Sequence, residues 1–225
     1  MFRRLELLVG NDINKLHNTN VIVFGVGGVG GYAAEMLVRS GISKITIVDY
    51  DCVDISNKNR QIIALDSTIG HSKVAVLKNR LLDINKNCEI LAINEKLLKD
   101  NIDKFDLKQY DYVIDAIDMV TSKIALIDFA HKNDIKIISA MGAGNRLDIP
   151  ECVIGDIFET SNDGLAKVLR QNLRKLGIEN HKVVYFRNKS LSTGETRTIG
   201  SIAYYPAISG AMLSAYVIND ILGRS

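Results

Sequence analysis

A glycine-rich turn near the start of the chain constrains the fold more than any other feature. Residues 25–30 read Gly-Val-Gly-Gly-Val-Gly, after a β-branched run at 21–25 and before a segment, 30–40, with apolar residues at helical spacing. A strand at 44–49 then completes a right-handed βαβ unit with parallel strands. Glycines in such a turn let the backbone approach phosphate oxygens, and the helix N-terminus receives their charge. We therefore expect a nucleotide phosphate site at Gly25, Gly27, Gly28 and Gly30.

The following residues continue this alternation of strands and helices. We predict strands at 89–94, 112–115 and 136–140, and helices at 73–84 and 122–133. Such an order is typical of α/β proteins with a Rossmann-like, doubly wound and mostly parallel sheet.

The alternation weakens after Gly142. Here we predict strands at 152–157 and 183–186, and helices at 165–176 and 208–222. A chain of 225 residues is short for two independent cores. We expect one domain, in which residues 1–145 form a Rossmann-like nucleotide-binding core and residues 146–225 form an appended segment.

Composition excludes several other classes of protein. A hydrophobic fraction of 47% and a charged fraction of 24% are usual for a folded soluble protein, and a net charge of +2 gives no strong global field. Three widely spaced cysteines form neither a disulfide framework nor a zinc site, so a reducing cytoplasm fits best. The start lacks the apolar run of a signal peptide, and Pro206 interrupts the most apolar stretch, 202–222. We therefore expect no membrane span.

The residues after the second predicted strand separate two kinds of nucleotide site. Asp49 ends that strand, where a carboxylate can accept both ribose hydroxyls, and a nicotinamide-dependent dehydrogenase fits equally well up to this point. Residues 51–61 then gather polar side chains where a dinucleotide site needs only one acid. Arg60 and Lys73 offer the cations that ATP requires and a nicotinamide does not, although either alone would be read as a solvated surface charge.

Asp118 completes this set of charged residues. It follows the buried strand at 112–115, at the sheet edge where ligands bind in open α/β proteins. A carboxylate there can hold magnesium against phosphate oxygens, and the alternative is an N-cap for the helix at 122–133. Asp115, inside the strand, is expected to be structural.

These motifs resemble the ubiquitin-activating-enzyme-like superfamily, which includes the ThiF and MoeB adenylyltransferases. The shared segments are VFGVGGVG, IVDYDCVDISNKNRQ, GHSKVAVLKNRL, VIDAIDMVTSK and GSIAYYPAISG. Within the superfamily the chain looks most like the tRNA threonylcarbamoyladenosine dehydratases. That closer resemblance rests on FRRLELLVG, ISAMGAGNRLDIPE and GLAKVLRQNLRKLGI.

The resemblance implies a role for each matching position. Asp49 holds the ribose, Asp118 holds magnesium, and the phosphates are held by Asn57, Arg60 and Lys73. Asp51 and Gln61 are further residues expected in the ATP site. An N-terminal arginine of the superfamily reaches the triphosphate of the other subunit in a homodimer, and Arg4 is the matching residue, with Arg3 as the alternative.

The activity implied by the resemblance is ATP-dependent dehydration of threonylcarbamoyladenosine in the tRNA anticodon loop. Adenylation of the threonyl carboxylate would be followed by ring closure with loss of AMP. The nucleophile lies in the same substituent, so no thioester-forming cysteine is needed. The alternative is an adenylyltransferase that activates the C-terminus of a ubiquitin-like sulfur carrier. Some relatives also associate with a cysteine desulfurase or sulfur acceptor.

Two features concern the substrate. The dehydratases carry a small hydroxyl residue and an acid where this chain has Phe186 and Arg187, which affects the expected substrate pocket. A basic run could bind tRNA phosphates or be a solvated helix face, and it comprises Lys167, Arg170, Arg174, Lys175, Lys182, Arg187 and Lys189.

Overall fold

The protein, described from a computed structural model over residues 1–191 and 198–224, is built on one seven-stranded sheet. The strand order is β3-β2-β1-β4-β5-β7-β6, and all neighbours are parallel except β6 and β7. The strands are β1 (Asn20–Phe24), β2 (Lys44–Val48), β3 (Glu89–Ile93), β4 (Tyr112–Asp115), β5 (Ile137–Ala140), β6 (Cys152–Asp156) and β7 (Lys182–Phe186). The α/β fold class with a mostly parallel sheet is therefore confirmed.

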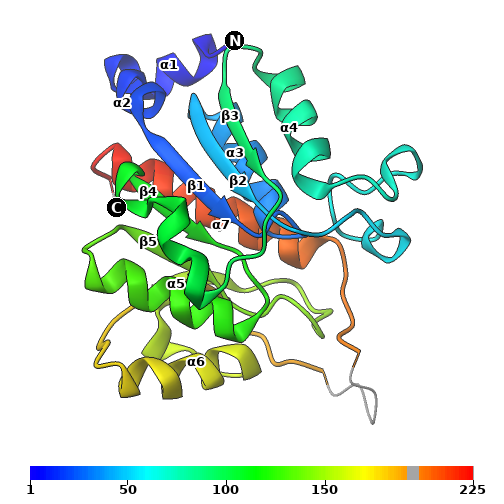
Figure 1. Ribbon diagram of the computed structural model, residues 1–225, viewed down its shortest axis with the longest axis vertical. Helices are drawn as coiled ribbons and strands as arrows, with labels where there is room; N and C mark the ends of the chain where they lie inside the picture. Colours follow the sequence, from blue (N-terminus) through cyan, green and yellow to red (C-terminus); the bar gives the residue numbers. More distant parts are fainter. Residues whose placement is uncertain (192–197, 225) are drawn as a thin grey trace.

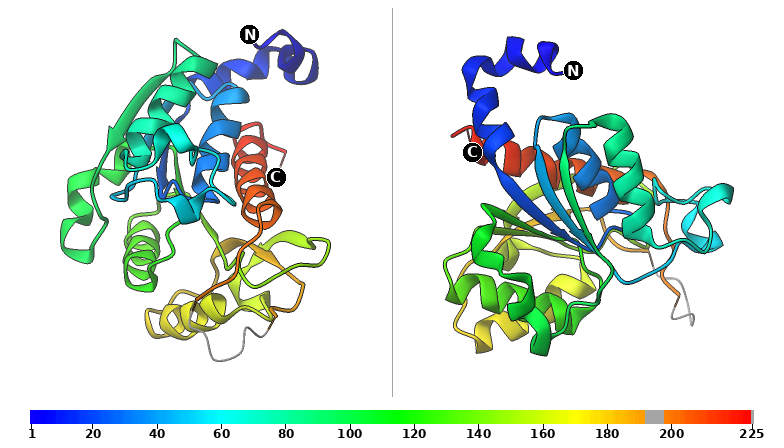
Figure 2. Two further views of the ribbon diagram at one scale, coloured as in Figure 1. Left: turned by 90° about the vertical axis from the view of Figure 1, so that its right-hand side faces the viewer. Right: turned by 45° about the horizontal axis from the view of Figure 1, so that its top comes forward.

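Helices cover both faces of this sheet (Figures 1 and 2). One face carries α3 (Gly30–Arg39), α4 (Lys73–Ile84) and α7 (Tyr204–Ile221), and the other carries α5 (Val120–Lys132) and α6 (Gly164–Lys175). Two short helices, α1 (Arg3–Val9) and α2 (Ile13–Asn18), precede β1 at the amino ends of the strands. Residues 146–225 thus supply two strands of the sheet and a covering helix on each face.

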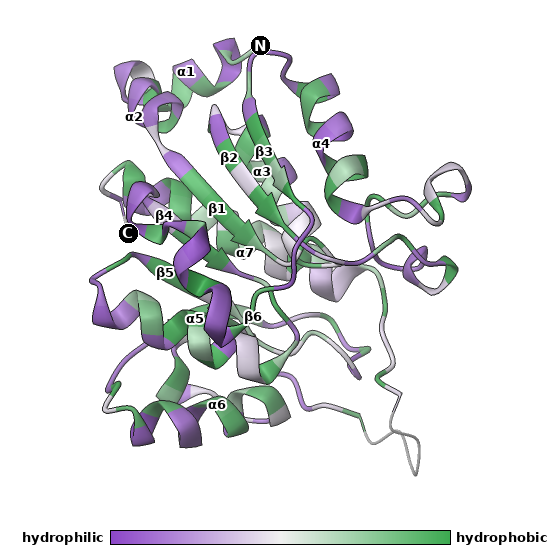
Figure 3. Cartoon of the chain, in the orientation of Figure 1, coloured by the Kyte–Doolittle hydropathy of each residue, from purple (hydrophilic) through white to green (hydrophobic). Residues whose placement is uncertain are grey.

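Alternating residues of the strands supply two hydrophobic cores. In β1, Val21 and Val23 face α3 and α7, while Ile22 and Phe24 face α5 and its neighbours, and all four side chains are buried. Figure 3 shows the resulting pattern, in which hydrophobic residues dominate the strands and the helices are mixed. Buried on both faces, these strands read as continuous apolar runs, which is why their positions could be predicted from sequence.

The helices differ from the sequence predictions mainly at their ends. The helix α7 begins at Tyr204, four residues before the predicted start at 208. Pro206 is compatible with this start, because it lies in the first turn, where backbone N–H groups have no hydrogen-bond acceptor within the helix. The helix α5 begins at Val120, and its N-cap is Met119. The helices α1 and α2 were not predicted, because six or seven residues are too few to show a helical period.

Two further properties bear on function. The strand order reverses between β1 and β4, which is where open α/β sheets bind ligands.

Among the residues that the structure describes, no helix combines the length and apolar character needed to cross a membrane.

The packing of α7 against α3 depends on Gly210. A Cβ on Gly210 would lie 2.5 Å from the Val29 carbonyl oxygen and 2.9 Å from Tyr32 Cβ. We predict that Gly210→Ala lowers the free energy of unfolding by about 1–3 kcal/mol through overpacking, as measured by urea denaturation. The matched control is Gly164→Ala at the start of α6, where the added Cβ meets nothing within 4 Å. Equal stability of the two variants would contradict this account of the helix contact.

Candidate functional site

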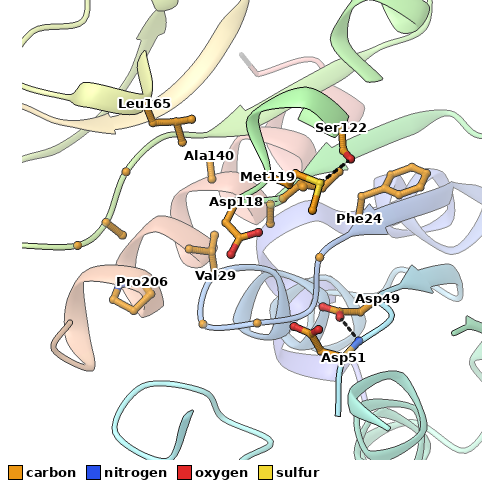
Figure 4. A pocket seen from close by; sticks show the side chains of 18 of the residues that line it. Phe24, Val29, Asp49, Asp51, Asp118, Met119, Ser122, Ala140, Leu165 and Pro206 are labelled. Carbon is orange, nitrogen blue, oxygen red and sulfur yellow. Dashed lines mark hydrogen bonds between the residues drawn. The ribbon is translucent and has the colours of Figure 1, made fainter. Parts of the chain in front are cut away.

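A pocket of about 650 Å³ opens at the carboxyl ends of β1 and β4, within the size range of small-molecule sites. The glycine turn and the ends of β2, β4 and β5 surround it, and α6 and α7 contribute from the C-terminal part of the chain. Figure 4 shows its interior. Of the residues that the sequence proposes for the site, those lining the pocket are Gly25, Gly27, Gly28, Asp49, Asp51, Arg60, Gln61, Lys73 and Asp118.

The glycine turn is held by close backbone contacts. Gly25 has a φ of +80°, and a Cβ there would lie 2.6 Å from the Ala116 carbonyl oxygen. A Cβ on Gly30 would lie 1.8 Å from the Gly25 carbonyl oxygen. Gly30 is buried and does not line the pocket, so its part is to let α3 start tightly against the turn. Both positions therefore exclude any larger residue.

Asp49 fixes the turn from the side of β2. Its carboxylate accepts hydrogen bonds from the backbone N–H of Val26 at 2.8 Å and of Asp51 at 2.9 Å. Each carboxylate oxygen keeps a further lone pair for a ligand hydroxyl. The same side chain can thus shape the glycine turn and bind a ribose.

Lys73 and Asp51 form an ion pair on the wall of the pocket. Their Nζ and Oδ2 atoms are 2.8 Å apart, and the lysine side chain is 7% exposed against 46% for the aspartate. Lys73 stands at the first position of α4, where the Lys73 backbone N–H donates to the Asp51 carbonyl. A buried ammonium beside a partly exposed carboxylate is well placed to turn toward an anionic ligand.

Arg60, Asn57 and Gln61 come from one irregular loop, and only two of them face the pocket. The Arg60 guanidinium donates to the Ser56 carbonyl at 2.8 Å and to Asn59 Oδ1 at 2.9 Å. Asn57 is buried and closes a capping box with Asp54, so it shapes the loop and does not line the pocket. Gln61 lines it with a buried Oε1 that has no hydrogen-bond partner in the part of the chain that the structure describes.

Asp118 lies between the two ends of the pocket. Figure 4 shows its carboxylate between the end with Asp49 and Asp51 and the end with Ala140 and Leu165. No side chain caps α5, so Asp118 does not serve as its N-cap. The pKa of Tyr50 is raised mainly by Asp51, then by partial burial, and also by Asp118 and Asp49. Among the residues that the structure describes, no three Asp, Glu, His or Cys side chains are gathered closely enough to form a metal site by themselves. A magnesium ion needs only one or two protein carboxylates when phosphate oxygens supply the other ligands, and Asp118 is the carboxylate available for this.

Arg4 does not line this pocket. It is exposed on α1, at the amino ends of the strands, whereas the pocket lies at their carboxyl ends. Nearby Leu7 and Leu8 are also exposed, at 83% and 74%. Within one chain, Arg4 therefore stays apart from the other candidate residues.

Sequence reasoning missed the apolar end of the pocket. Met119, Leu165 and Val168 line it, together with Ile199, which follows the undescribed residues 192–197. Leu165 and Val168 share one face of α6, whereas Met119 and Ile199 come from other parts of the chain, so no single local pattern brings the four residues together. Residues Gly142 to Gly144, within the segment ISAMGAGNRLDIPE, also line the pocket. The two glycines directly after the predicted strand at 136–140 are the sequence feature that could have indicated this.

Phe186 and Arg187, which depart from the dehydratase pattern, do not line the pocket. Phe186 is fully buried, with its ring 4.7 Å from the Tyr205 ring and 5.8 Å from the Arg146 guanidinium. Arg146 is itself buried and donates to the carbonyls of Asn162 and Asn188. Neither residue at which the chain departs from the dehydratase pattern therefore contributes to the lining of the pocket.

The cysteines differ in their fitness for thiolate chemistry. Burial raises the pKa of Cys88 to about 11 and that of Cys152 to about 12, so both remain protonated thiols near neutral pH. Cys52 is free and exposed, and it does not line the pocket.

Fold and pocket together define a nucleotide-binding protein of the Rossmann-like α/β class. The profile of the ThiF family matches residues 3–224, and the chain therefore belongs to the ThiF family. It is 39% identical to the tRNA threonylcarbamoyladenosine dehydratase of Bacillus subtilis over 98% of this chain and 94% of that protein.

Structural and more distant sequence comparisons agree with this family. The crystal structure of Escherichia coli tRNA N6-threonylcarbamoyladenosine dehydratase, TcdA, in complex with ATP has a TM-score of 0.92 at 30% identity, covering 99% of this chain and 94% of that chain. A probable molybdopterin-synthase adenylyltransferase of Porphyra purpurea is 38% identical over only 51% of this chain and 30% of that protein.

The position of Lys73 leads to a test of the kind of ligand. We predict that Lys73→Gln weakens ATP binding by about 10- to 100-fold, as expected for a lost charge-assisted contact. Isothermal calorimetry with ATP and magnesium measures this. The matched control is Lys86→Gln, at an exposed position outside the pocket. Unchanged ATP affinity in Lys73→Gln, or tighter binding of NAD than of ATP by the unmodified protein, would contradict the prediction.

Proposed function

We propose that this protein uses ATP to dehydrate threonylcarbamoyladenosine in the anticodon loop of tRNA. The proposal rests on one observation above all, which is the gathering of Asp49, Arg60, Lys73 and Asp118 around the glycine turn in a single pocket. A full-length relationship to a protein named for this activity supports it.

ATP would lie along the glycine turn in an extended pose. Its ribose would be bound by Asp49, and its phosphates would follow the turn toward Arg60 and Lys73. Glycines at positions 25, 27 and 28 leave the backbone free for this approach, because the pocket side of the turn carries no side chain there. Gln61, whose amide Nε2 lies 3.5 Å from the position of a Cβ on Gly27, would donate a hydrogen bond in the same region.

The charged residues would prepare the α-phosphate for attack by the substrate carboxylate. Arg60 and Lys73 would stabilise the charge that builds on the phosphates as pyrophosphate leaves. Asp118 would hold magnesium, which would neutralise part of the charge of the phosphates. Lys73 can serve in this way once it exchanges part of its contact with Asp51 for phosphate oxygens.

The apolar end of the pocket would accept the modified base. Met119, Leu165 and Val168 offer a surface for a purine that has left the anticodon stack, as single-stranded RNA bases commonly do on proteins. The threonyl carboxylate would then point toward Asp118 and the α-phosphate. Ring closure joins two groups of one substituent, so AMP would leave without a covalent enzyme intermediate.

An exposed basic stripe supports contact with the tRNA backbone. Lys167 and Arg174 are seven residues apart on α6, which places them on one exposed face of the helix, beside the face that buries Ala166, Leu169 and Leu173. The Arg174 guanidinium also lies 5.1 Å from the centre of the Phe158 ring. Lys175, Arg187 and Lys189 are also exposed. Arg170 instead donates to Thr160, and we assign it to the fold.

We also propose a homodimer in which Arg4 of one subunit completes the pocket of the other. Its distance from the pocket of its own chain and the exposed Leu7 and Leu8 on the same helix are consistent with this arrangement. The cytoplasm is the proposed location, in agreement with three free cysteines. Association with a cysteine desulfurase or sulfur acceptor remains a prediction from the family resemblance.

The proposed reaction can be tested directly with tRNA that carries threonylcarbamoyladenosine. We predict that ATP and magnesium cause the loss of one water from this nucleoside, detected by mass spectrometry, with release of pyrophosphate. Asp118→Asn should lower the rate by about 100-fold or more, because the metal loses its carboxylate. Absence of water loss and of pyrophosphate with the unmodified protein would refute the proposed function.

The same assay separates the adenylyltransferase alternative. We expect Cys52→Ser to keep its turnover on tRNA, since ring closure needs no thioester. Pyrophosphate release with a ubiquitin-like sulfur carrier ending in two glycines, and none with the tRNA, would favour the alternative.

Mixed dimers test the role of Arg4. We predict that Arg4→Ala and Lys73→Gln are each inactive alone, and that random exchange of their subunits restores about a quarter of the normal activity. In a mixed dimer one pocket would combine an intact Lys73 with an intact Arg4 from the other subunit. No recovery after verified subunit exchange would show that Arg4 does not act across the dimer.

A further inference from the structure

A buried chain of hydrogen bonds runs beneath the pocket and plays no part in the mechanism described so far. It begins with the ion pair of Lys123 and Asp115, 2.8 Å apart and both fully buried. Ser139 Oγ lies 2.6 Å from Asp115 Oδ2 and 2.8 Å from His181 Nε2, and His181 Nδ1 lies 3.1 Å from His131 Nε2. The chain thus joins β4, β5, α5 and the residue before β7.

The direction of every hydrogen bond in this chain follows from Asp115. An ionised carboxylate only accepts, so the Ser139 hydroxyl must donate its proton to Asp115. Ser139 Oγ then accepts from His181 Nε2–H, which leaves Nδ1 of a neutral His181 as an acceptor for His131 Nε2–H. All donors therefore point toward Asp115, and each histidine is confined to one tautomer.

The surroundings keep both histidines neutral. Burial, followed by the charges of His131 and Lys123, lowers the pKa of His181 to about 3. Burial also lowers the pKa of His131, against the opposing effect of Asp128. The buried charges are consequently those of Lys123 and Asp115, which cancel.

The other end of the chain reaches the turn that carries Asp118. Lys123 Nζ donates to the Ile117 carbonyl at 3.0 Å and lies 3.4 Å from the Asp115 carbonyl. Ile117 N–H in turn donates to Asp115 Oδ1 at 3.1 Å. The backbone on both sides of Ala116 is therefore tied to one ion pair, directly before Asp118.

Ser139 connects this ion pair to the second wall of the pocket. It pairs with Asp115 in the register of β4 and β5, and the next residue, Ala140, lines the pocket. The segments that carry Asp118 and Ala140 follow these two neighbouring strands, and both residues stand at the pocket in the site view (Figure 4). A change in the Ser139 contact would move both relative to each other.

We propose that Ser139 and His181 are positioning residues of the adenylation site, which hold the Asp118 turn and the end of β5 in register through the Asp115–Lys123 pair. This inference rests on the proposed function for its reaction, and on the hydrogen-bond chain for its residues. Neither side chain lines the pocket or touches the substrate. Their effect is on where the metal-binding carboxylate stands.

Two substitutions at His181 test the hydrogen bonds apart from packing. His181→Gln keeps a donor for Ser139 and an acceptor for His131, whereas His181→Leu keeps a similar volume without either. We expect His181→Leu to lower kcat for pyrophosphate release by about 10- to 100-fold, with little change in KM for tRNA, and His181→Gln to recover most of it. Lys132→Gln, beside His131 but outside the chain, is the matched control.

The magnesium dependence supplies a readout that a loss of stability would not change. We expect His181→Leu to need more magnesium for half-maximal activity and for ATP binding in calorimetry, while ATP binding without magnesium stays constant. If His181→Leu does not fold, Ser139→Ala, with Ser139→Thr as the variant that keeps the hydroxyl, decides the question in the same way.

The outcomes separate this inference from the proposed function. The inference about Ser139 and His181 would be overturned if folded His181→Leu and His181→Gln had the same kcat and the same magnesium dependence. The same result for Ser139→Ala and Ser139→Thr would also overturn it. If the unmodified protein binds ATP with magnesium but does not dehydrate the tRNA, the proposed reaction fails. The magnesium shift in the variants would then still decide whether the buried chain positions Asp118.

Discussion

The close approach of two backbone turns is the constraint on which the site depends. Gly25 packs against the carbonyl of Ala116 so tightly that a Cβ would lie 2.6 Å from its oxygen. The turn after β1 and the turn after β4 are thereby fixed against each other at the point where the strand order reverses. The amides that we propose to bind phosphate belong to the first turn and the backbone of Asp118 follows the second, so the separation of the two segments is set by backbone contact.

Charge is arranged in two layers around these turns. In the pocket, the partly exposed Asp51 accompanies a buried Lys73, and this pair can rearrange when an anion enters. Beneath it, Lys123 and Asp115 are fully buried and connected to Ser139 and His181, so their geometry is constrained from several sides. A buried ion pair adds little net stability, because desolvation offsets its attraction. Its contribution here is to fix the geometry of the turn.

The sequence predicted the fold well where one local pattern decides the structure. The apolar strand runs and the glycine turn placed β1 to β5, and the start of α4 at Lys73 was predicted to the residue. The apolar end of the pocket could not be predicted, since Met119, Leu165 and Ile199 meet only through the tertiary fold. The link from His131 to Ser139 was missed for the same reason, because these residues are far apart in sequence and show no metal-ligand spacing.

The C-terminal part of the chain closes against the loops made first. The Asn59 side chain donates a hydrogen bond to the carbonyl of Ser201. Pro206 packs beside Gly28, where an added Cβ would lie 3.2 Å from Pro206 Cβ. During synthesis on the ribosome, the N-terminal half can form its βαβ units early, but its ligand cleft stays unfinished until α7 has emerged. A chain whose translation stops before α7 would contain the charged residues of the pocket, because all of them precede this helix. Its pocket would still be incomplete, because Pro206 of α7 would be missing from the lining.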